Sequence, residues 1–230
     1  AQAKRACLDL LAAADRPTAL PCGNDVIAQG ALYAALKLGL SVPRDLSIIG
    51  TPPVEAKEAF TRVLNGLIAM SRLRWPQGLA GRDIEAVGRL PLWMAGQDFD
   101  HGLGHGVGAY LSVHEGPQRL SKLSTVPLSE GMILSIEPGY YREGAFGIRL
   151  ENLAVVRSAP DLPGGDAHRA MLSWETLSFA PIDTRLIVPQ MLTQGARDWL
   201  NAYHRDVAEK IGPRVSPVTK LWLDAATAPV

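Results

Sequence analysis

The sequence has 230 residues, 47% of them hydrophobic and 20% charged, and its 23 basic side chains match its 23 acidic ones in number. This length suits one large domain or two small ones. A balanced charge gives no reason to expect an electrostatic partner, and no apolar run reaches the ~18 residues of a membrane helix. We therefore expect neither a nucleic acid nor a membrane as a partner. Cys7 and Cys22 form no metal or redox motif, so we expect a reduced, cytoplasmic setting.

The first fifty residues alternate between helical and strand patterns. The expected elements are a helix over 3–14, a strand over 18–22, a helix capped by Asn24 or Asp25 that stops at Gly39, and a strand over 45–50. Asn and Asp favour the N-cap of a helix, and Gly favours the position after its end. Helices and strands in alternation predict a small parallel sheet.

A resemblance to a known family lies in this region, in Cys22-Gly-Asn-Asp-Val-Ile-Ala28 and Ala35-Leu-Lys-Leu-Gly-Leu-Ser-Val-Pro-Arg-Asp-Leu-Ser-Ile-Ile-Gly50. Both stretches are similar to the effector-binding domain of lac-repressor-type regulators. In that family the aspartate that matches Asp25 contacts a sugar or similar effector. Residues 1–50 are a fragment of such a domain and cannot enclose a ligand, so we interpret Asp25 as a helix cap. An effector-binding fragment of a transcriptional regulator stays open as an alternative.

Thr51-Pro-Pro53 stands where that family has an aromatic residue and two aspartates. Two consecutive prolines cannot continue a helix and stiffen a linker. We therefore predict a boundary here, between a first domain over 1–50 and a second over 51–230.

Residues 51–230 contain both helical and strand patterns. Helices are expected over 54–74, 81–96 with a bend or restart at Pro91, 193–211 and 221–227. Strands are expected over 131–137, 146–156 and 177–183. The first two strands flank Gly144, which indicates a hairpin turn.

The predicted hairpin brings two carboxylates together. A turn centred on Gly144 places Glu137 across from Glu151 and Gly139 across from Arg149. Cross-strand partners have Cβ atoms ~5 Å apart, and like charges at that distance destabilise a sheet. A shared proton, a nearby arginine or a metal ion could offset the repulsion. A metal-free hydrolase that uses Glu137 and Glu151 as acid and nucleophile is also open, because retaining glycosidases hold such groups ~5 Å apart.

Three of the five histidines lie within fourteen residues, at His101, His105 and His114, among five glycines and Pro117. Such a run has few apolar side chains to pack, and glycine lets the backbone approach a ligand closely. One imidazole with two carboxylates is a mixed nitrogen and oxygen ligand set, which suits Mn, Co, Fe or Zn.

Three segments carry a second resemblance: 100–117 around the histidines, Pro127-Leu-Ser-Glu-Gly-Met-Ile-Leu-Ser-Ile-Glu-Pro-Gly-Tyr-Tyr141, and Gly147-Ile-Arg-Leu-Glu-Asn-Leu153. Together they are similar to aminopeptidase P (Xaa-Pro aminopeptidase), a pita-bread metallopeptidase, over residues 51–230. The resemblance implies an α+β fold: an incomplete pita-bread (creatinase/aminopeptidase-like) domain preceded by a short α/β fragment. It also implies a metal-dependent aminopeptidase that releases an N-terminal residue adjacent to proline, by attack of metal-activated water on the peptide carbonyl. Manganese is the first choice of divalent metal, the partner is a peptide with proline in second position, and a homodimer is left open.

The resemblance assigns roles residue by residue. It implies that the metal ligands are His105, Glu137 and Glu151, that Glu137 is also the general base, that His114 and His101 are catalytic, and that Arg149 and Tyr141 bind substrate. His114 would support the oxyanion of the tetrahedral intermediate.

The departure from that family lies upstream of residue 54. There the family has two further aspartate ligands in an Asp-Gly-rich segment, and this chain has its regulator-like residues instead. Asp98 and Asp100 precede the histidines, and we interpret them as capping or turn residues. The resemblance thus predicts a fusion of a regulator fragment with a truncated catalytic domain, whose activity is impaired by the missing ligands.

Overall fold

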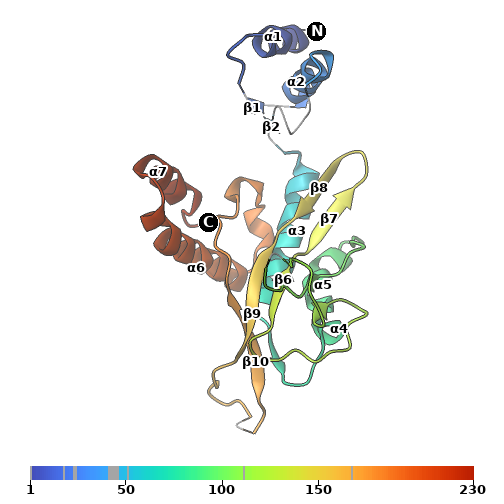
Figure 1. Ribbon diagram of the computed structural model, residues 1–230, viewed down its shortest axis with the longest axis vertical. Helices are drawn as coiled ribbons and strands as arrows, with labels where there is room; N and C mark the ends of the chain where they lie inside the picture. The colour runs from blue at the N-terminus through green and yellow to red at the C-terminus, as the bar shows by residue number, and fades with distance from the viewer. Residues whose placement is uncertain are drawn as a thin grey trace. The chain divides into compact units, whose positions relative to one another are not determined.

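A computed structural model of the chain describes residues 2–17, 19–22, 25–40, 47–50, 52–110, 112–166 and 168–230. The chain divides into two compact units, Ala1–Pro53 and Val54–Val230, and each is described by itself (Figure 1). No helix in these described ranges has both the length and the apolar character needed to cross a bilayer.

The described residues of the first unit form two helices and a two-stranded sheet. Its elements are α1 (Gln2–Leu11), β1 (Ala19–Cys22), α2 (Asp25–Lys37) and β2 (Ser47–Gly50). The strands pair in parallel, with Ala19 opposite Ser47, which confirms the predicted order and pairing. Small side chains fill the space between the helices: Cys7, Leu11, Ala31, Ala34 and Ala35. Asn24, Asp45 and the side chain of Asp25 lie outside the described residues, so the predicted helix cap stays a prediction.

The second unit holds the remaining helices. These are α3 (Val54–Ser71), α4 (Gly81–Ile84), α5 (Ala86–Trp93), α6 (Gln194–Ile211), α7 (Pro217–Ala226) and the 3-10 turns Thr184–Leu186, Pro189–Met191 and Gly212–Arg214. The predicted helix over 81–96 does restart, but at Glu85, and Pro91 lies inside α5. The last helix begins four residues earlier than predicted because Ser216 caps it, with Oγ accepting from the Thr219 N–H at 3.2 Å, and Pro217 fits the first helical position.

Four antiparallel strands form the main sheet, in the order β3 (Arg74–Pro76), β10 (Met171–Thr176), β9 (Asn152–Ser158) and β6 (Ile133–Ile136). The strand predicted over 177–183 is wrong: the strand is β10, and the chain leaves the sheet after Leu177. The alternation of Leu172 and Trp174 marks β10, and Trp174 packs against Trp75 at a tilted angle of 43°, with ring centroids 4.7 Å apart. Pro181 lacks an N–H and cannot donate to a ladder.

Two short strand pairs complete the unit: β4 (Gly104–His105) with β5 (Arg119–Leu120), and β7 (Gly139–Arg142) with β8 (Phe146–Arg149). Gly139 lies opposite Arg149, and Ile136 lies opposite Asn152. The register predicted from Gly144 is therefore confirmed, although each predicted strand is shorter or is split in two. Glu137 lies between β6 and β7, and Glu151 lies between β8 and β9.

Helix α3 forms the centre of the core, and its fully buried side chains include Val63, Leu64, Leu67, Ile68 and Met70. It approaches α5 closely at Gly66, where an added Cβ atom would lie 2.2 Å from the carbonyl oxygen of Gly88. In Figure 1, α6 and α7 lie to the left of the long strands β9 and β10, while α4 and α5 lie to the right. This packing fixes the sheet whose strand ends carry the glutamates.

Candidate metal centre

A cluster of three ionisable residues lies where β4 meets the hairpin. It comprises His105, Glu137 and Glu151, and one ligand atom from each lies within 4.8 Å of the others. His105 comes from β4, and the two glutamates come from the breaks between paired strands. The structure thus brings together the three residues that the sequence predicted as metal ligands.

The glutamates belong to residues 133–158, which we name the carboxylate hairpin. Glu137 is only 8% exposed, whereas Glu151 is exposed. The Arg149 guanidinium donates from one terminal nitrogen to Glu137 Oε2 at 3.2 Å. Arg149 therefore offsets part of the repulsion between the two carboxylates, as expected of a nearby cation.

His105 belongs to residues 101–117, which we name the histidine segment. Its backbone N–H donates to Ser135 Oγ at 3.0 Å, and the Ser135 hydroxyl lies 3.4 Å from Glu137 Oε1, to which it donates. Nδ1 of His105 lies 3.0 Å from the Gly106 carbonyl, which can only accept, so Nδ1 carries the proton. In the neutral imidazole the lone pair is then on Nε2, which lies 3.5 Å from Glu137 Oε1. This is the tautomer that a metal-ligating histidine needs.

Gly104 lets the histidine segment approach the sheet. A Cβ atom at this position would lie 1.9 Å from the carbonyl oxygen of Ser135. Any side chain here would push His105 away from Glu137. The glycine next to His105 therefore serves close packing.

His101, Tyr141 and Arg149 form one hydrogen-bonded chain. Nδ1 of His101 donates to the Gly102 carbonyl at 2.7 Å, so Nε2 accepts from the Tyr141 hydroxyl at 3.0 Å. The Arg149 Nε–H in turn donates to the Tyr141 oxygen at 2.8 Å. This chain connects His101 through Arg149 to Glu137.

The charge on Arg149 is reinforced by its surroundings. Burial acts to lower the pKa of Arg149, but the hydrogen bond with Tyr141 and the charges of Tyr141, Glu137 and Glu151 act to raise it. The net pKa is raised above its ordinary value, so the guanidinium stays cationic beside the glutamates.

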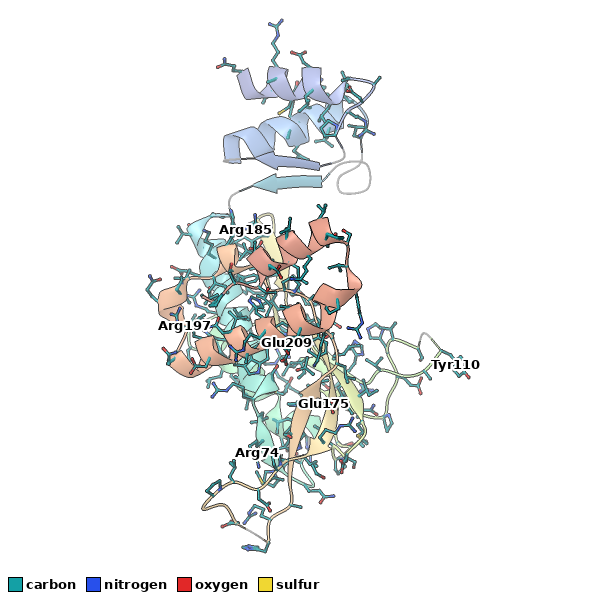
Figure 2. All side chains as sticks on the ribbon, turned by 90° about the vertical axis from the view of Figure 1, so that its left-hand side faces the viewer. Arg74, Tyr110, Glu175, Arg185, Arg197 and Glu209 are labelled. Carbon is teal, nitrogen blue, oxygen red and sulfur yellow. The ribbon has the colours of Figure 1, made fainter. Side chains whose placement is uncertain are left out.

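A cavity of about 510 Å³ opens beside the cluster. His101, His105, His114, Glu137 and Arg149 line it, while Glu151 lines a neighbouring cavity of about 250 Å³. The exposed His114 ring lies against His105, with centroids 4.1 Å apart and an angle of 44° between the rings. Tyr110, in the same segment, projects into solvent away from the cluster (Figure 2).

Two residues that support the cluster were not identified from the sequence. Ser135 bridges His105 and Glu137, and the one sequence feature that pointed to this role was its position on the same strand face as Glu137. Arg89 is 3% exposed and donates to the carbonyls of Phe99 and His101, both at 2.7 Å. The position of an arginine within the apolar helix α5 was the sequence feature that could have indicated this role.

The predicted turn residues lie outside the cluster. Asp98 Oδ1 accepts from the Phe99 N–H at 2.8 Å and from Arg89 at 2.9 Å. Neither Asp98 nor Asp100 belongs to the group of potential ligands found among the described residues. Asp98 thus fixes the turn before the histidine segment, which agrees with its interpretation as a turn residue.

The fold and the cluster together indicate a class: the chain holds part of a pita-bread domain of the metallopeptidase type. The model of metallopeptidase family M24 matches residues 44–158, and the model of the C-terminal region of peptidase M24 matches residues 170–230. The chain belongs to metallopeptidase family M24. A model of a periplasmic binding protein-like domain matches residues 1–83, which agrees with the regulator-like character of the first fifty residues.

Three relatives sharpen the family relationship. Aminopeptidase P2 from Arabidopsis thaliana is 45% identical over 184 residues, which are 78% of this chain and 26% of that protein. Xaa-Pro aminopeptidase 2 from Homo sapiens is 42% identical over 186 residues, 79% of this chain and 27% of that protein. The solved structure of X-prolyl aminopeptidase from Caenorhabditis elegans, a cytosolic enzyme with a di-nuclear active site, matches with a TM-score of 0.72 and 35% identity, over 78% of this chain and 29% of that one. The chain therefore spans about a quarter of the length of the curated relatives it matches.

Proposed function

We propose that this chain carries the metal-binding part of a metal-dependent aminopeptidase that releases an N-terminal residue ahead of proline. One observation carries the proposal. The cluster of His105, Glu137 and Glu151 is formed within a chain that is 45% identical to an aminopeptidase P.

The donor set fits a divalent metal. His105 offers the Nε2 lone pair because Nδ1 is held by the Gly106 carbonyl, and Glu137 and Glu151 offer carboxylate oxygens. Hard and borderline cations accept such ligands, and manganese is our first choice. When bound, the ion would lower the pKa of a water and polarise the scissile carbonyl.

Different residues of the chain would then transfer the proton, stabilise the oxyanion and position the peptide. Glu137 accepts a proton from the attacking water, and its low exposure keeps that carboxylate away from competing solvent. His114 faces the cavity next to His105 and supports the developing oxyanion with an N–H. His101, Tyr141 and Arg149 hold the peptide in register with the cluster through their shared hydrogen bonds.

We infer that the cluster is an incomplete set. The resemblance to aminopeptidase P calls for two further aspartates in an Asp-Gly-rich segment upstream of residue 54, and this chain has its regulator-like residues there instead. Fewer ligands lower metal affinity and activity together. On this proposal residues 1–50 are a regulator-like fragment joined to an impaired catalytic domain at 51–230. We further propose a cytoplasmic location, as for the Caenorhabditis elegans enzyme, while a homodimer stays a prediction.

Metal titration and peptide hydrolysis test the proposal. We expect weak binding of Mn²⁺ by calorimetry, and slow release of alanine from Ala-Pro-Ala that stops when EDTA is added. Tight binding of two ions with rapid turnover would contradict the impaired site. Hydrolysis that survives EDTA would favour the metal-free carboxylate pair, and saturable binding of a sugar or nucleoside would favour the regulator fragment.

A further inference from the structure

Arg119 lies in the cavity beside the cluster, and its charge has no partner among the described residues. Strand β5 pairs with β4 so that Arg119 is directly opposite His105, and both residues line the 510 Å³ cavity. Cross-strand partners point to the same face of a sheet, with Cβ atoms ~5 Å apart. No hydrogen bond or ion pair joins the Arg119 side chain to any residue in the described ranges.

The other arginine in this cavity is occupied differently. Arg149 bonds Glu137 at 3.2 Å and Tyr141 at 2.8 Å, so its donors serve the cluster itself. Arg119 is exposed, and all of its guanidinium N–H groups are available. The cavity therefore contains one arginine that orders protein groups and a second that is free to bind a ligand.

The backbone beneath Arg119 is firmly placed. Its neighbour Leu120 is 0% exposed, and a Cβ atom on Gly81 would lie 1.9 Å from the Arg119 carbonyl oxygen. The Gly106 N–H donates to the Gln118 carbonyl at 3.0 Å, which ties β5 to the histidine segment. The guanidinium thus extends from a fixed point next to His105.

A second donor lies two residues further on. Ser121, just after the end of β5, lines the same cavity as Arg119. Its Oγ is buried and has no hydrogen-bond partner among the described residues. A change of its χ1 rotamer would turn the hydroxyl toward the cavity.

We propose that Arg119, assisted by Ser121, binds a carboxylate of the peptide beyond the scissile bond. The guanidinium plane matches a carboxylate with two parallel hydrogen bonds. An extended peptide advances about 3.5 Å per residue, so a carboxylate one or two residues past the cluster falls within reach of an arginine opposite His105. This inference rests on the proposed function, since it assigns a substrate class to the same cavity: short peptides that end in a free carboxylate.

Calorimetry on the full chain tests the assignment, with and without Mn²⁺. The probes are Ala-Pro-Ala, Ala-Pro-Ala-amide and Ala-Pro-Glu-amide. We expect the free acid to bind about 10-fold more tightly than the amide, as charged hydrogen bonds contribute more than neutral ones. Arg119→Gln should remove this preference and leave Mn²⁺ affinity unchanged. Binding of Ala-Pro-Glu-amide as tight as that of Ala-Pro-Ala would overturn the assignment to peptides that end in a free carboxylate.

A matched control separates the site from general charge. Lys122→Gln removes the same charge three residues away, on an exposed side chain that does not line the cavity, and should keep the preference. Arg119→Lys should retain part of it, and thermal unfolding checks that each variant is folded. Equal affinity of the acid and the amide, no saturable binding of either, or a preference that survives Arg119→Gln would overturn the proposal. Failure of metal binding or hydrolysis alone would overturn the proposed function instead, since the preference is also measured without metal.

Discussion

The carboxylate hairpin and the histidine segment bring potential metal ligands to the same point, but the two regions are held there in different ways. The hairpin is positioned by strand register, because pairing on both sides of Glu137 and Glu151 follows from one turn at Gly144. Among the described residues of the histidine segment, only Gly104 and His105 lie in a strand. It is held by close backbone contact and by a few hydrogen bonds from other elements.

The difference shows where each region is vulnerable. A ladder distributes its stability over many backbone hydrogen bonds, so changes of single side chains in the hairpin should alter chemistry more than position. The histidine segment depends on individual contacts, such as Gly104 against Ser135 and the His101 carbonyl against Arg89. Single changes there should alter position first. Four substitutions test this contrast, in decreasing order of their expected effect.

Glu137→Gln should alter chemistry without moving the hairpin. The amide keeps the shape but loses the charge, and we expect Mn²⁺ affinity to fall about 100-fold or more. The binding free energy of a structural zinc site is roughly 10–16 kcal/mol, so each of its four ligands contributes about 3 kcal/mol on average, which is the basis of this expected loss. Calorimetry measures the affinity, and Glu143→Gln, an equal charge change at the exposed hairpin turn, is the control. An unchanged affinity in Glu137→Gln would remove this residue from the ligand set.

Gly104→Ala should displace the histidine segment. The new Cβ would lie 1.9 Å from the backbone carbonyl oxygen of Ser135. Overpacking of this kind lowers the free energy of unfolding by about 2 kcal/mol. Urea unfolding measures the loss. Gly116→Ala in the same segment, where a Cβ meets nothing within 4 Å, should cost less than about 0.5 kcal/mol. Similar values for both variants would show that the close contact at Gly104 does not hold the segment.

Ser135→Ala tests the link between the two regions. It removes the acceptor for the His105 N–H and the donor to Glu137 Oε1. Loss of a residue that orients metal ligands lowers metal affinity by at least about 10-fold, and we expect a loss near that lower bound. Ser173→Ala makes the same change on β10, where no side-chain hydrogen bond of the described residues is lost. If both variants bind Mn²⁺ as the parent does, Ser135 does not couple the regions.

His204 tests the support behind the hairpin through pH. It is fully buried on α6, where its Nε2 accepts from the Ile182 N–H at 3.1 Å, and the neighbouring Tyr203 hydroxyl donates to Asn152 Oδ1 at 3.2 Å. Burial lowers the pKa of His204, against the opposing effect of backbone hydrogen bonds with Ile182 and Ala228.

The sign of the pH effect follows from that direction. Between the lowered folded pKa and the ordinary value near 6.5, the unfolded chain binds a proton that the folded chain does not. The free energy of unfolding should therefore rise with pH through this window and level off above it. His204→Gln should lose that slope, whereas His168→Gln, at an exposed site, should keep it. Urea unfolding across pH measures both, and an unchanged slope in His204→Gln would assign the effect to other groups.

Local patterns in the amino-acid sequence were enough for part of this protein. A turn residue and strand alternation specified the hairpin register, so Glu137 and Glu151 could be paired from their positions along the chain. The helices α3 and α6 were likewise predicted to within a few residues, because a long apolar periodicity is a local property. The motifs around His105 identified the family for the same reason: they lie within short stretches of chain.

Contacts between distant segments depend instead on the packing of the whole second unit. The hydrogen bond between the His105 N–H and Ser135 joins residues 30 positions apart, and the hydrogen bond from Arg89 to the His101 carbonyl joins residues 12 positions apart. The strand at 171–176 was mistaken for 177–183 because both stretches mix apolar and polar residues, and only pairing with β3 and β9 distinguishes them. Strand pairing and side-chain anchors of this kind arise in the tertiary fold, since their free energy comes from partners that no local pattern specifies.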